Sequence, residues 1–463
     1  MYFINEKEIF DLINNTKFDK KEFLKVIEKA KKLQGLNLRE TAILLSLDVK
    51  KNKSNAKELF DAAHYVKEQI YGSRIVLFAP LYLGNYCVNN CLYCGFRVEN
   101  SKLKRKVLDE KELKKEVIEL LKQGQKRLLL VVGESKLTGI DYLENAIKKV
   151  YSIKQANGQI RRVNVNAPPL SVKEFKRLKK AGIGTYQLFQ ETYHYETYKK
   201  VHPSGPKADY KNRLFVMDRA QKAGIDDVGL GVLFGLYDYK FEVLALLQHV
   251  KHLEKKFNVG PHTISMPRIE HALNAPLTKN PPCQVSDNNF KKLIAVLRLA
   301  VPYTGMILST REKAEFRDKL FELGISQISA GSRTNPGGYA ESEQNKKDEQ
   351  QFELHDSRTL SEIVSNLCNK NYLPSFCTAC YRLGRTGDKF MELAKPGNIQ
   401  NFCLPNALLT FKEYLVDYAK QNERTKGEEK ILSEIKNIPD KKIRELTLKK
   451  LKRIEKGKRD LYF

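Results

Sequence analysis

The feature that most constrains this fold is a repeated alternation of short β-rich runs with helical segments. Eight such runs occur, at 74–83, 127–133, 162–167, 185–190, 227–234, 262–267, 305–310 and 325–331. The segments between them carry apolar residues at helical spacing among lysine and glutamate, and several end in glycine, a common signal for the end of a helix. Eight strands separated by helices predict an α/β fold, a complete (β/α)8 barrel of the TIM type.

An open, doubly wound sheet is the alternative arrangement. That fold usually carries a glycine-rich phosphate-binding fingerprint after its first strand, and none follows residues 74–83. Amphipathic helical patterns precede the alternation, and a polar, turn-rich stretch follows it before a last helical region. We therefore expect an N-terminal helical extension (1–73), the barrel (74–339) and a mainly helical C-terminal domain (340–463).

The composition bears on partners and location. The net charge is +27, but the lysines lie in mixed lysine and glutamate stretches such as 20–32, which are typical of solvated helix faces. The excess still favours an anionic partner. No RNA-binding module is recognisable, which argues against an RNA-modifying enzyme and against nucleic acid as a partner. The sequence has no long apolar run and no N-terminal signal, so we expect a cytoplasmic protein without a membrane partner.

Three of the eight cysteines, Cys87, Cys91 and Cys94, lie in one short loop with the spacing Cys-x3-Cys-x2-Cys. Clustered cysteines in a chain without a secretion signal indicate a metal or redox site rather than disulfides. Three thiolates can hold three irons of a cubane [4Fe–4S] cluster and leave the fourth iron open. The alternative is a zinc site, which usually has four cysteine or histidine ligands, and no fourth one lies nearby.

This loop resembles the motif of the radical S-adenosylmethionine (SAM) superfamily, including the aromatic Tyr93 before the last cysteine. The loop follows the first predicted strand, and barrel active sites form at the C-terminal ends of strands. The resemblance implies that SAM binds the open iron and is cleaved to a 5′-deoxyadenosyl radical. Candidate SAM contacts after the next strands are Gly133, Glu134, Asn166, Glu191 and, on the following helix, Arg213.

A second group of cysteines lies near the C-terminus, with the spacing Cys377-x2-Cys380-x22-Cys403. Three thiolates could again hold a cluster with an open iron. A zinc site is an equally good interpretation, because Cys-x2-Cys with a distant third ligand is common among zinc sites. The spacing alone leaves both open. Cys283 and Cys368 stand apart from both groups and are expected to be buried thiols.

Longer segments extend the resemblance. The stretch around the second group, FCTACYRLGRTGDKFM (376–391), and the closing KGKRDLYF (456–463) resemble the HydG family of radical SAM tyrosine lyases, which help to mature [FeFe]-hydrogenase. The resemblance covers nearly the whole chain and includes FQETYHYETYKKVHPSGPKADY (189–210), GPHTISMPR (260–268) and QISAGSRTNPGGY (327–339). The barrel motifs are shared with ThiH, the tyrosine lyase of thiazole synthesis.

The family resemblance implies an activity in two stages. Radical attack on L-tyrosine cleaves its Cα–Cβ bond to p-cresol and dehydroglycine, which is then converted to CO and cyanide. These ligands are assembled at an auxiliary [4Fe–4S] or [5Fe–5S] cluster with a labile, cysteine-bound iron, giving an Fe(CO)2(CN) precursor of the hydrogenase H-cluster. The expected partners are L-tyrosine, SAM and cysteine, a reducing electron donor and the other hydrogenase maturases.

The same resemblance implies the ligands of the auxiliary cluster. Cys377, Cys380 and Cys403 would hold it, which makes the C-terminal domain an iron–sulfur domain, and His262 would ligate the labile iron. Because His262 begins a predicted strand, we expect it at the N-terminal mouth of the barrel, opposite the SAM cluster. The dehydroglycine fragment would then travel through the barrel interior between the two clusters.

A tyrosine carboxylate needs a cation, and planar arginine suits it. Ser309 with Arg311, at the end of the seventh strand, is the first candidate pair, and Ser332 with Arg333, after the eighth, is the second. Two other functions stay open at this point. One is a ThiH-like 2-iminoacetate synthase whose C-terminal cysteines assemble nothing, and the other is a non-catalytic iron–sulfur scaffold or carrier.

Overall fold

The computed structural model describes residues 2–341 and 348–463, so residues 342–347 of the expected C-terminal domain and Met1 of the expected N-terminal extension lie outside the described part. Four helices come first. Asn5, Asp19 and Asn37 cap three of them, because each side chain accepts a hydrogen bond from a backbone amide in the first turn. The four helices are α1 (Glu6–Asn15), α2 (Lys20–Lys31), α3 (Leu38–Ser46) and α4 (Lys53–Tyr71).

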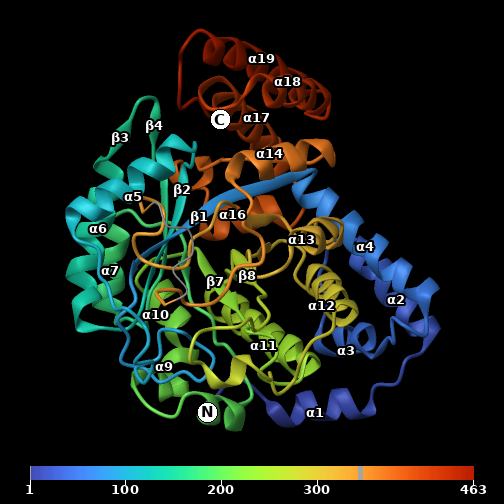
Figure 1. Cartoon of the computed structure of the whole chain (residues 1–463). Helices are drawn as coiled ribbons and strands as arrows, with labels where there is room; N and C mark the ends of the chain where they lie inside the picture. Colours follow the sequence, from blue (N-terminus) through green and yellow to red (C-terminus); the bar gives the residue numbers. More distant parts are fainter. Residues whose placement is uncertain (1, 342–347) are drawn as a thin grey trace.

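Eight parallel strands close into a barrel (Figure 1). They follow one another in chain order, and the first strand closes the barrel by pairing with the last, where Val76 lies opposite Gln327. The closed sheet confirms the predicted (β/α)8 barrel and excludes the open, doubly wound sheet. The strands are β1 (Arg74–Gly84), β2 (Arg127–Val132), β5 (Arg162–Asn166), β6 (Tyr186–Gln187), β7 (Val228–Gly231), β8 (Thr263–Ser265), β9 (Gly305–Leu308) and β10 (Gln327–Ser329).

Several strands are shorter than the apolar pattern predicts. The run 185–190 yields only the two residues of β6, and the run 262–267 yields only the three of β8. Beyond β6 the chain stays hydrogen-bonded to its neighbour, because the Leu188 and Gln190 amides donate to carbonyls of β7, and the pairing ends in an isolated bridge between Glu191 and Val232. A small antiparallel hairpin, β3 (Lys154–Gln155) and β4 (Gly158–Gln159), lies outside the barrel and has no counterpart among the predicted elements.

Helices surround the barrel and face it with apolar side chains. In α7 (Val172–Lys180), Phe175 and Leu178 are buried, and Ser171 and Glu174 form a capping box. The N-terminal helices form a further layer, with α4 on α12 and with α1 and α3 on α11. None of the described helices is long and apolar enough to cross a membrane. The other helices of this region are α5 (Glu110–Lys122), η1 (Lys136–Thr138), α6 (Ile140–Ser152), α8 (Tyr195–Val201), η2 (Pro206–Ala208), α9 (Tyr210–Leu214), α10 (Val216–Lys222), α11 (Tyr239–Phe257), η3 (Pro276–Thr278), α12 (Asp287–Ala300), α13 (Ala314–Leu320) and η4 (Phe321–Leu323).

The C-terminal region joins the barrel through a ninth strand, β11 (Leu373–Ser375), which pairs in parallel with β1. Val76 of β1 lies opposite both Gln327 and Ser375, so β10 and β11 flank β1 on opposite sides. Because β2 begins to pair with β1 only at Ala79, β11 occupies the edge below it, at the N-terminal mouth. The remaining helices are α14 (Leu360–Asn369), α15 (Ala379–Arg382), α16 (Gly387–Ala394), α17 (Gln400–Asp417), α18 (Gln421–Ile435) and α19 (Lys441–Glu455), and Figure 1 shows α17 to α19 gathered at one end of the molecule.

One continuous hydrophobic core joins all three segments expected from the sequence. It includes Phe23 from the N-terminal helices, Leu230 from the barrel and Leu408 from α17. The segments therefore pack as one body, and their division at residues 73 and 339 stays a prediction.

A buried arginine on α12 fixes the chain just before the last two barrel strands. The fully buried Arg298 guanidinium donates hydrogen bonds of 2.6–3.1 Å to the backbone carbonyls of Pro302, Thr304 and Gly324. These carbonyls lie directly before β9 and β10. Because a buried carbonyl without a donor costs about 1–3 kcal/mol, Arg298 holds the two loops in place.

Replacing Arg298 with methionine should lower the free energy of unfolding by about 3 kcal/mol, because three buried carbonyls lose their donor. Urea denaturation followed by circular dichroism measures this change. The matched control is Asn288→Ala, at an exposed position on the same helix, which should change the free energy by less than about 0.5 kcal/mol. An Arg298→Met protein as stable as the parent would contradict the role given to this side chain.

Candidate functional site

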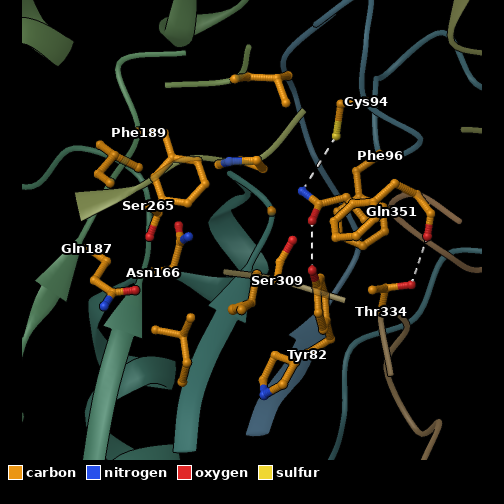
Figure 2. A pocket seen from close by; sticks show the side chains of 18 of the residues that line it. Tyr82, Cys94, Phe96, Asn166, Gln187, Phe189, Ser265, Ser309, Thr334 and Gln351 are labelled. Carbon is orange, nitrogen blue, oxygen red and sulfur yellow. Dashed lines mark hydrogen bonds between the residues drawn. The ribbon is translucent and has the colours of Figure 1, made fainter. Parts of the chain in front are cut away.

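A cavity at the C-terminal ends of the barrel strands brings together most of the residues predicted from the sequence. Figure 2 shows Cys94, Asn166 and Ser309 projecting into it from different elements. Barrel enzymes place their active sites at this end, so the cavity is the candidate active site. The predicted residues that line it are Cys87, Cys91, Tyr93, Cys94, Gly133, Glu134, Asn166, Glu191, Arg213, Ser309, Arg311 and Ser332.

Residues 85–97, which we call the cysteine loop, are held by their own backbone and by one arginine. The Cys94 amide donates to the Cys91 carbonyl at 3.2 Å. Arg105 donates hydrogen bonds of 2.6–2.8 Å to three loop carbonyls, those of Asn85, Phe96 and Arg97. Burial raises the pKa of the Cys91 thiol to about 12, so a metal must displace its proton on binding.

Gly133 lets the end of β2 approach the cysteine loop. A Cβ atom at Gly133 would lie 2.3 Å from the carbonyl oxygen of Tyr86, so no side chain fits. Its neighbour Glu134 accepts hydrogen bonds from the loop through its backbone carbonyl, from the Val88 amide at 2.8 Å, and through its carboxylate, from the Asn89 side chain at 2.6 Å. Gly133 and Glu134 therefore brace the loop, and Asn89 joins the site although the sequence analysis did not single it out.

Glu191 combines a strained backbone with two cationic partners. Its φ of 73° lies in the left-handed region, which a residue with a long side chain rarely adopts. Its carboxylate accepts hydrogen bonds from Lys207 at 2.7 Å and from Arg213 at 3.4 Å. Burial alone would raise the Glu191 pKa, but the two cations outweigh burial and hold it below its ordinary value. The cavity thus keeps an ionised carboxylate, and Lys207 is a second residue that the sequence analysis missed.

Tyr93 and Asn166 line the same cavity as Glu191. The Tyr93 hydroxyl is 2.6 Å from Nε2 of the buried His202, and this contact fixes the orientation of the Tyr93 ring. The Lys207 ammonium stands 5.4 Å from the centre of the Tyr93 ring. These contacts join the aromatic residue of the cysteine motif to the Glu191 ion pair.

Arg311 is a cavity-lining cation without an acidic partner among the described residues. Its guanidinium lies 3.5 Å from the centre of the Phe352 ring and donates one long hydrogen bond of 3.5 Å to the Arg268 carbonyl. Its backbone amide lies 3.4 Å from the Ser309 hydroxyl, which ties the two predicted residues together. Because a guanidinium has five N–H donors, Arg311 can bind an anion in the cavity.

The two residues of the second predicted pair, Ser332 and Arg333, line different cavities. Ser332 lines the cavity, and its buried hydroxyl has no hydrogen-bond partner among residues 2–341 and 348–463. Arg333 does not reach the cavity; it lines a separate one together with Tyr414 and Tyr418 at the end of α17. The path of the loop after β10 thus separates two residues that are neighbours in the sequence, and Arg311 is the better-placed cation.

A segment assigned to the C-terminal domain from the sequence returns to this cavity. Gln351 and Phe352 line it. The Tyr82 hydroxyl donates to Oε1 of Gln351 at 2.8 Å, and Nε2 of Gln351 lies 3.7 Å from the Cys94 sulfur (Figure 2). These residues are far apart in the sequence, so no local pattern could have predicted their contact.

The second group of cysteines lies at the opposite, N-terminal mouth of the barrel. Cys377 follows β11, and its carbonyl accepts a hydrogen bond of 3.2 Å from Arg127, the first residue of β2. The neighbouring Cys380 thiol, together with the nearby Arg74, lowers the pKa of Cys403. Among the described residues, no three His, Cys, Asp or Glu side chains are positioned so that they could hold a single metal ion. The three thiols nevertheless lie close enough to affect one another's pKa values.

His262 lies at the same mouth, directly before β8, as the sequence predicts. Its ring packs against Phe390 and Tyr381, with ring centres 4.4 and 5.6 Å away, and Tyr381 is the neighbour of Cys380. Its Nδ1 atom lies 3.5 Å from a carboxylate oxygen of Asp227 and is buried without a hydrogen bond among the described residues. Burial lowers the His262 pKa, which favours the neutral imidazole that binds metals.

Two family models match this chain. The Radical SAM superfamily matches residues 81–250, and the Biotin and Thiamin Synthesis associated domain matches residues 265–373. The 2-iminoacetate synthase of Escherichia coli (strain K12) is 32% identical over 335 residues, which cover 72% of this chain and 85% of that protein. The barrel and its cysteine loop therefore belong to a radical SAM protein.

Two solved HydG structures match more of the chain. One, described as a maturase of the [FeFe]-hydrogenase, is 54% identical with a TM-score of 0.95, and the match covers 100% of both chains. This chain belongs to the HydG family. A second HydG structure, from Carboxydothermus hydrogenoformans, is 43% identical with a TM-score of 0.83, covering 96% of this chain and 97% of that one.

Membership of the HydG family makes this chain a radical SAM enzyme rather than a carrier. The superfamily implies a [4Fe–4S] cluster with SAM, and the cavity fits that group. Three thiols line it from one loop. Because Gly133 has no side chain, the end of β2 can lie directly against that loop. The match to a HydG structure spans the whole chain, whereas the 2-iminoacetate synthase matches 72% of it. A HydG-type enzyme is therefore favoured over the thiazole-synthesis alternative.

Replacing Gly133 with alanine should remove most of the iron from the first cysteine group, because the new Cβ would push the Tyr86 carbonyl and the cysteine loop aside. Iron and sulfide content after anaerobic reconstitution measures this loss, in a Cys377→Ala background that silences the second group. The matched control is Gly139→Ala, where the nearest atom is 3.6 Å from the new Cβ. Full iron content in the Gly133→Ala protein would refute the bracing role.

Proposed function

We propose that this chain is a carbon–carbon lyase that cleaves the Cα–Cβ bond of L-tyrosine to p-cresol and dehydroglycine. When bound, the [4Fe–4S] cluster and SAM supply the 5′-deoxyadenosyl radical that starts the reaction. The observation that carries the proposal is Arg311, a cation without an acidic partner among the described residues, beside Ser309 and in the same cavity as Cys94. The similarity to HydG structures and to a 2-iminoacetate synthase supports it.

The cavity has the two kinds of surface that tyrosine needs. Arg311 and Ser309 offer donors to the substrate carboxylate, whereas Phe96 and Phe189 provide apolar walls for the phenol ring. Gly231 makes room for one wall, because a Cβ there would lie 2.3 Å from the Phe189 ring. An amino acid with an aromatic side chain therefore fits better than a purely polar substrate.

We assign a second set of cavity-lining residues to SAM. They are Tyr93, Glu134, Asn166, Glu191 and Arg213. The ionised Glu191 suits the ribose hydroxyls or the ammonium group. Arg213 uses two of its donors on the Phe189 carbonyl and on Glu191, and its other N–H groups can meet the SAM carboxylate.

We infer that the dehydroglycine fragment travels through the barrel interior, where few residues separate the cavity from the second cysteine group. At β6, the Thr185 hydroxyl lies 3.1 Å from that of Tyr381, and two residues later Gln187 lines the cavity. At β10, the same two-residue step separates Gln327 from Ser329, which also lines the cavity. Two residues of a strand span about 7 Å. Dehydroglycine moving along this path would stay out of bulk water.

At the N-terminal mouth we propose that Cys377, Cys380 and Cys403 hold an auxiliary [4Fe–4S] or [5Fe–5S] cluster and that His262 binds its labile iron. Dehydroglycine would yield CO and cyanide there, and both would be assembled with cysteine into an Fe(CO)2(CN) precursor. The neutral imidazole of His262 and its free Nδ1 support this role. A reducing electron donor and the other hydrogenase maturases are the proposed partners.

The second candidate function is 2-iminoacetate synthesis without ligand assembly, which the similarity to the Escherichia coli enzyme favours. Tyrosine turnover would then end in dehydroglycine or its hydrolysis product glyoxylate, without CO or cyanide. Assaying both products during tyrosine turnover separates the two functions. Failure to form deoxyadenosine in a tyrosine-dependent manner would remove both.

Arg311→Met should lower kcat/KM for tyrosine by about 100-fold, because a hydrogen-bonded charge pair contributes about 1.5–3 kcal/mol. Release of p-cresol, followed by chromatography, measures it. Arg333→Met is the matched control and should keep nearly the parental rate, because Arg333 lies in a separate cavity. If the Arg333 variant were the damaged one, the assignment of the two candidate arginines would be reversed.

Cys377→Ala and His262→Ala should each keep tyrosine-dependent p-cresol formation and lose the iron–carbonyl product. Infrared and EPR spectroscopy of the reconstituted proteins during tyrosine turnover measure the product. Cys368→Ala, which changes a cysteine outside both groups, should keep both activities. Loss of tyrosine cleavage in either of the first two variants would end the proposed division of labour between the two mouths.

A further inference from the structure

Backbone contacts hold Gln351 against the cysteine loop. The Gly95 amide donates to the Gln351 carbonyl at 3.0 Å, and the Gln351 amide donates to the Thr334 carbonyl at 3.1 Å. A Cβ atom at Gly95 would lie 2.6 Å from the Gln350 carbonyl oxygen, so the two backbones touch directly. The position of residue 351 therefore does not depend on its own side chain.

The Gln351 side chain connects the wall of the cavity to a cluster ligand (Figure 2). Its Oε1 accepts a hydrogen bond from the Tyr82 hydroxyl at 2.8 Å, and its Nε2 donates to the Cys94 sulfur at 3.7 Å. A thiolate can only accept, whereas a tyrosine hydroxyl can donate. The thiolate therefore selects the orientation of the amide with its NH2 group toward sulfur, and the Tyr82 hydroxyl donates to Oε1 in that orientation.

The side-chain donor at Cys94 differs from the one at Cys87, the other cysteine of the loop that a side-chain amide contacts. The Asn89 side chain donates to the Cys87 sulfur at 3.6 Å, but the same nitrogen lies only 2.6 Å from the Glu134 carboxylate, its nearer acceptor. For Nε2 of Gln351, the Cys94 sulfur is the only acceptor within the described residues. The Gln351 donor is thus directed at the sulfur alone.

We propose that Gln351 raises the reduction potential of the SAM-binding cluster by donating a hydrogen bond to the Cys94 sulfur. Reduction adds negative charge to a cluster and its sulfurs, and hydrogen bonds to the more negative acceptor are stronger. Hydrogen bonds to sulfur are one of the main controls on such potentials. Gln351 is a positioning residue that acts through Cys94, with Tyr82 orienting its amide. The inference goes beyond the proposed function, because it needs only the radical SAM cluster and no particular substrate.

The test is an EPR-monitored redox titration of the full-length reconstituted protein, in which the signal that changes on adding SAM identifies the first cluster. Gln351→Leu removes the donor and should lower the midpoint potential by up to about 59 mV, the one-electron equivalent of a tenfold change. Tyr82→Phe leaves the donor but frees the amide to rotate, and should give a smaller shift in the same direction.

The matched control is Thr334→Val, which removes the hydrogen bond of 3.1 Å from the Thr334 hydroxyl to the Phe352 carbonyl and leaves the sulfur contact in place. Its midpoint potential should equal that of the parent. Iron content is measured for every variant. If Gln351→Leu fails to hold iron, Gln351→Glu, which has nearly the same shape but no donor, should lower the potential at least as far. An unchanged potential in an iron-replete Gln351 variant, or an equal shift in Thr334→Val, would overturn the proposal.

Discussion

Both mouths of this barrel depend on the pairing of one long strand. β1 has 11 residues, whereas β2, the next longest strand among the described residues, has 6. At about 3.3 Å per residue β1 spans roughly 36 Å. Its C-terminal end leads into the cysteine loop, its residues 76–78 close the barrel against β10, and its residues 74–76 pair with β11, which leads into Cys377. The hydrogen bonds of β1 therefore fix the two cysteine groups relative to one another.

The buried charged residues differ between the two mouths of the barrel. At the C-terminal mouth Glu191 is neutralised by Lys207 and Arg213, which leaves Arg311 as a cation for a bound anion. At the N-terminal mouth the buried Arg127 and Arg162 each keep a nitrogen without a hydrogen-bond partner among the described residues. Burial raises the pKa of the Cys377 thiol, and the positive charge of Arg127 opposes that rise. The net charge of +27, spread over solvated helix faces, gives no sign of these few buried cations.

Patterns within short segments of the sequence predicted the strands and the end of the barrel at which each residue lies. Alternating apolar runs predicted the barrel, and because parallel strands put their C-terminal ends at one mouth, residues as distant as Cys91, Glu191 and Arg311 could be expected together. The same logic placed His262 at the other mouth. It could not find Gln351, which reaches Cys94 only because the chain returns after the barrel and rests on Gly95. It also could not separate Ser332 from Arg333, because the direction of each side chain depends on the path of a loop rather than on spacing.

The sequence by itself determined the chemistry of the ligands and the order of the strands. Cysteine spacing, the glycine at position 133 and the alternation of strand and helix are properties of short segments, and each short segment carries its own constraint. The tertiary structure alone decided which cation lacks an acidic partner, which amide faces the Cys94 sulfur, and how few residues separate the two mouths. Those relations arise from contacts between segments far apart in the chain, and only the closure of β1 on β10 brings these segments within hydrogen-bonding distance.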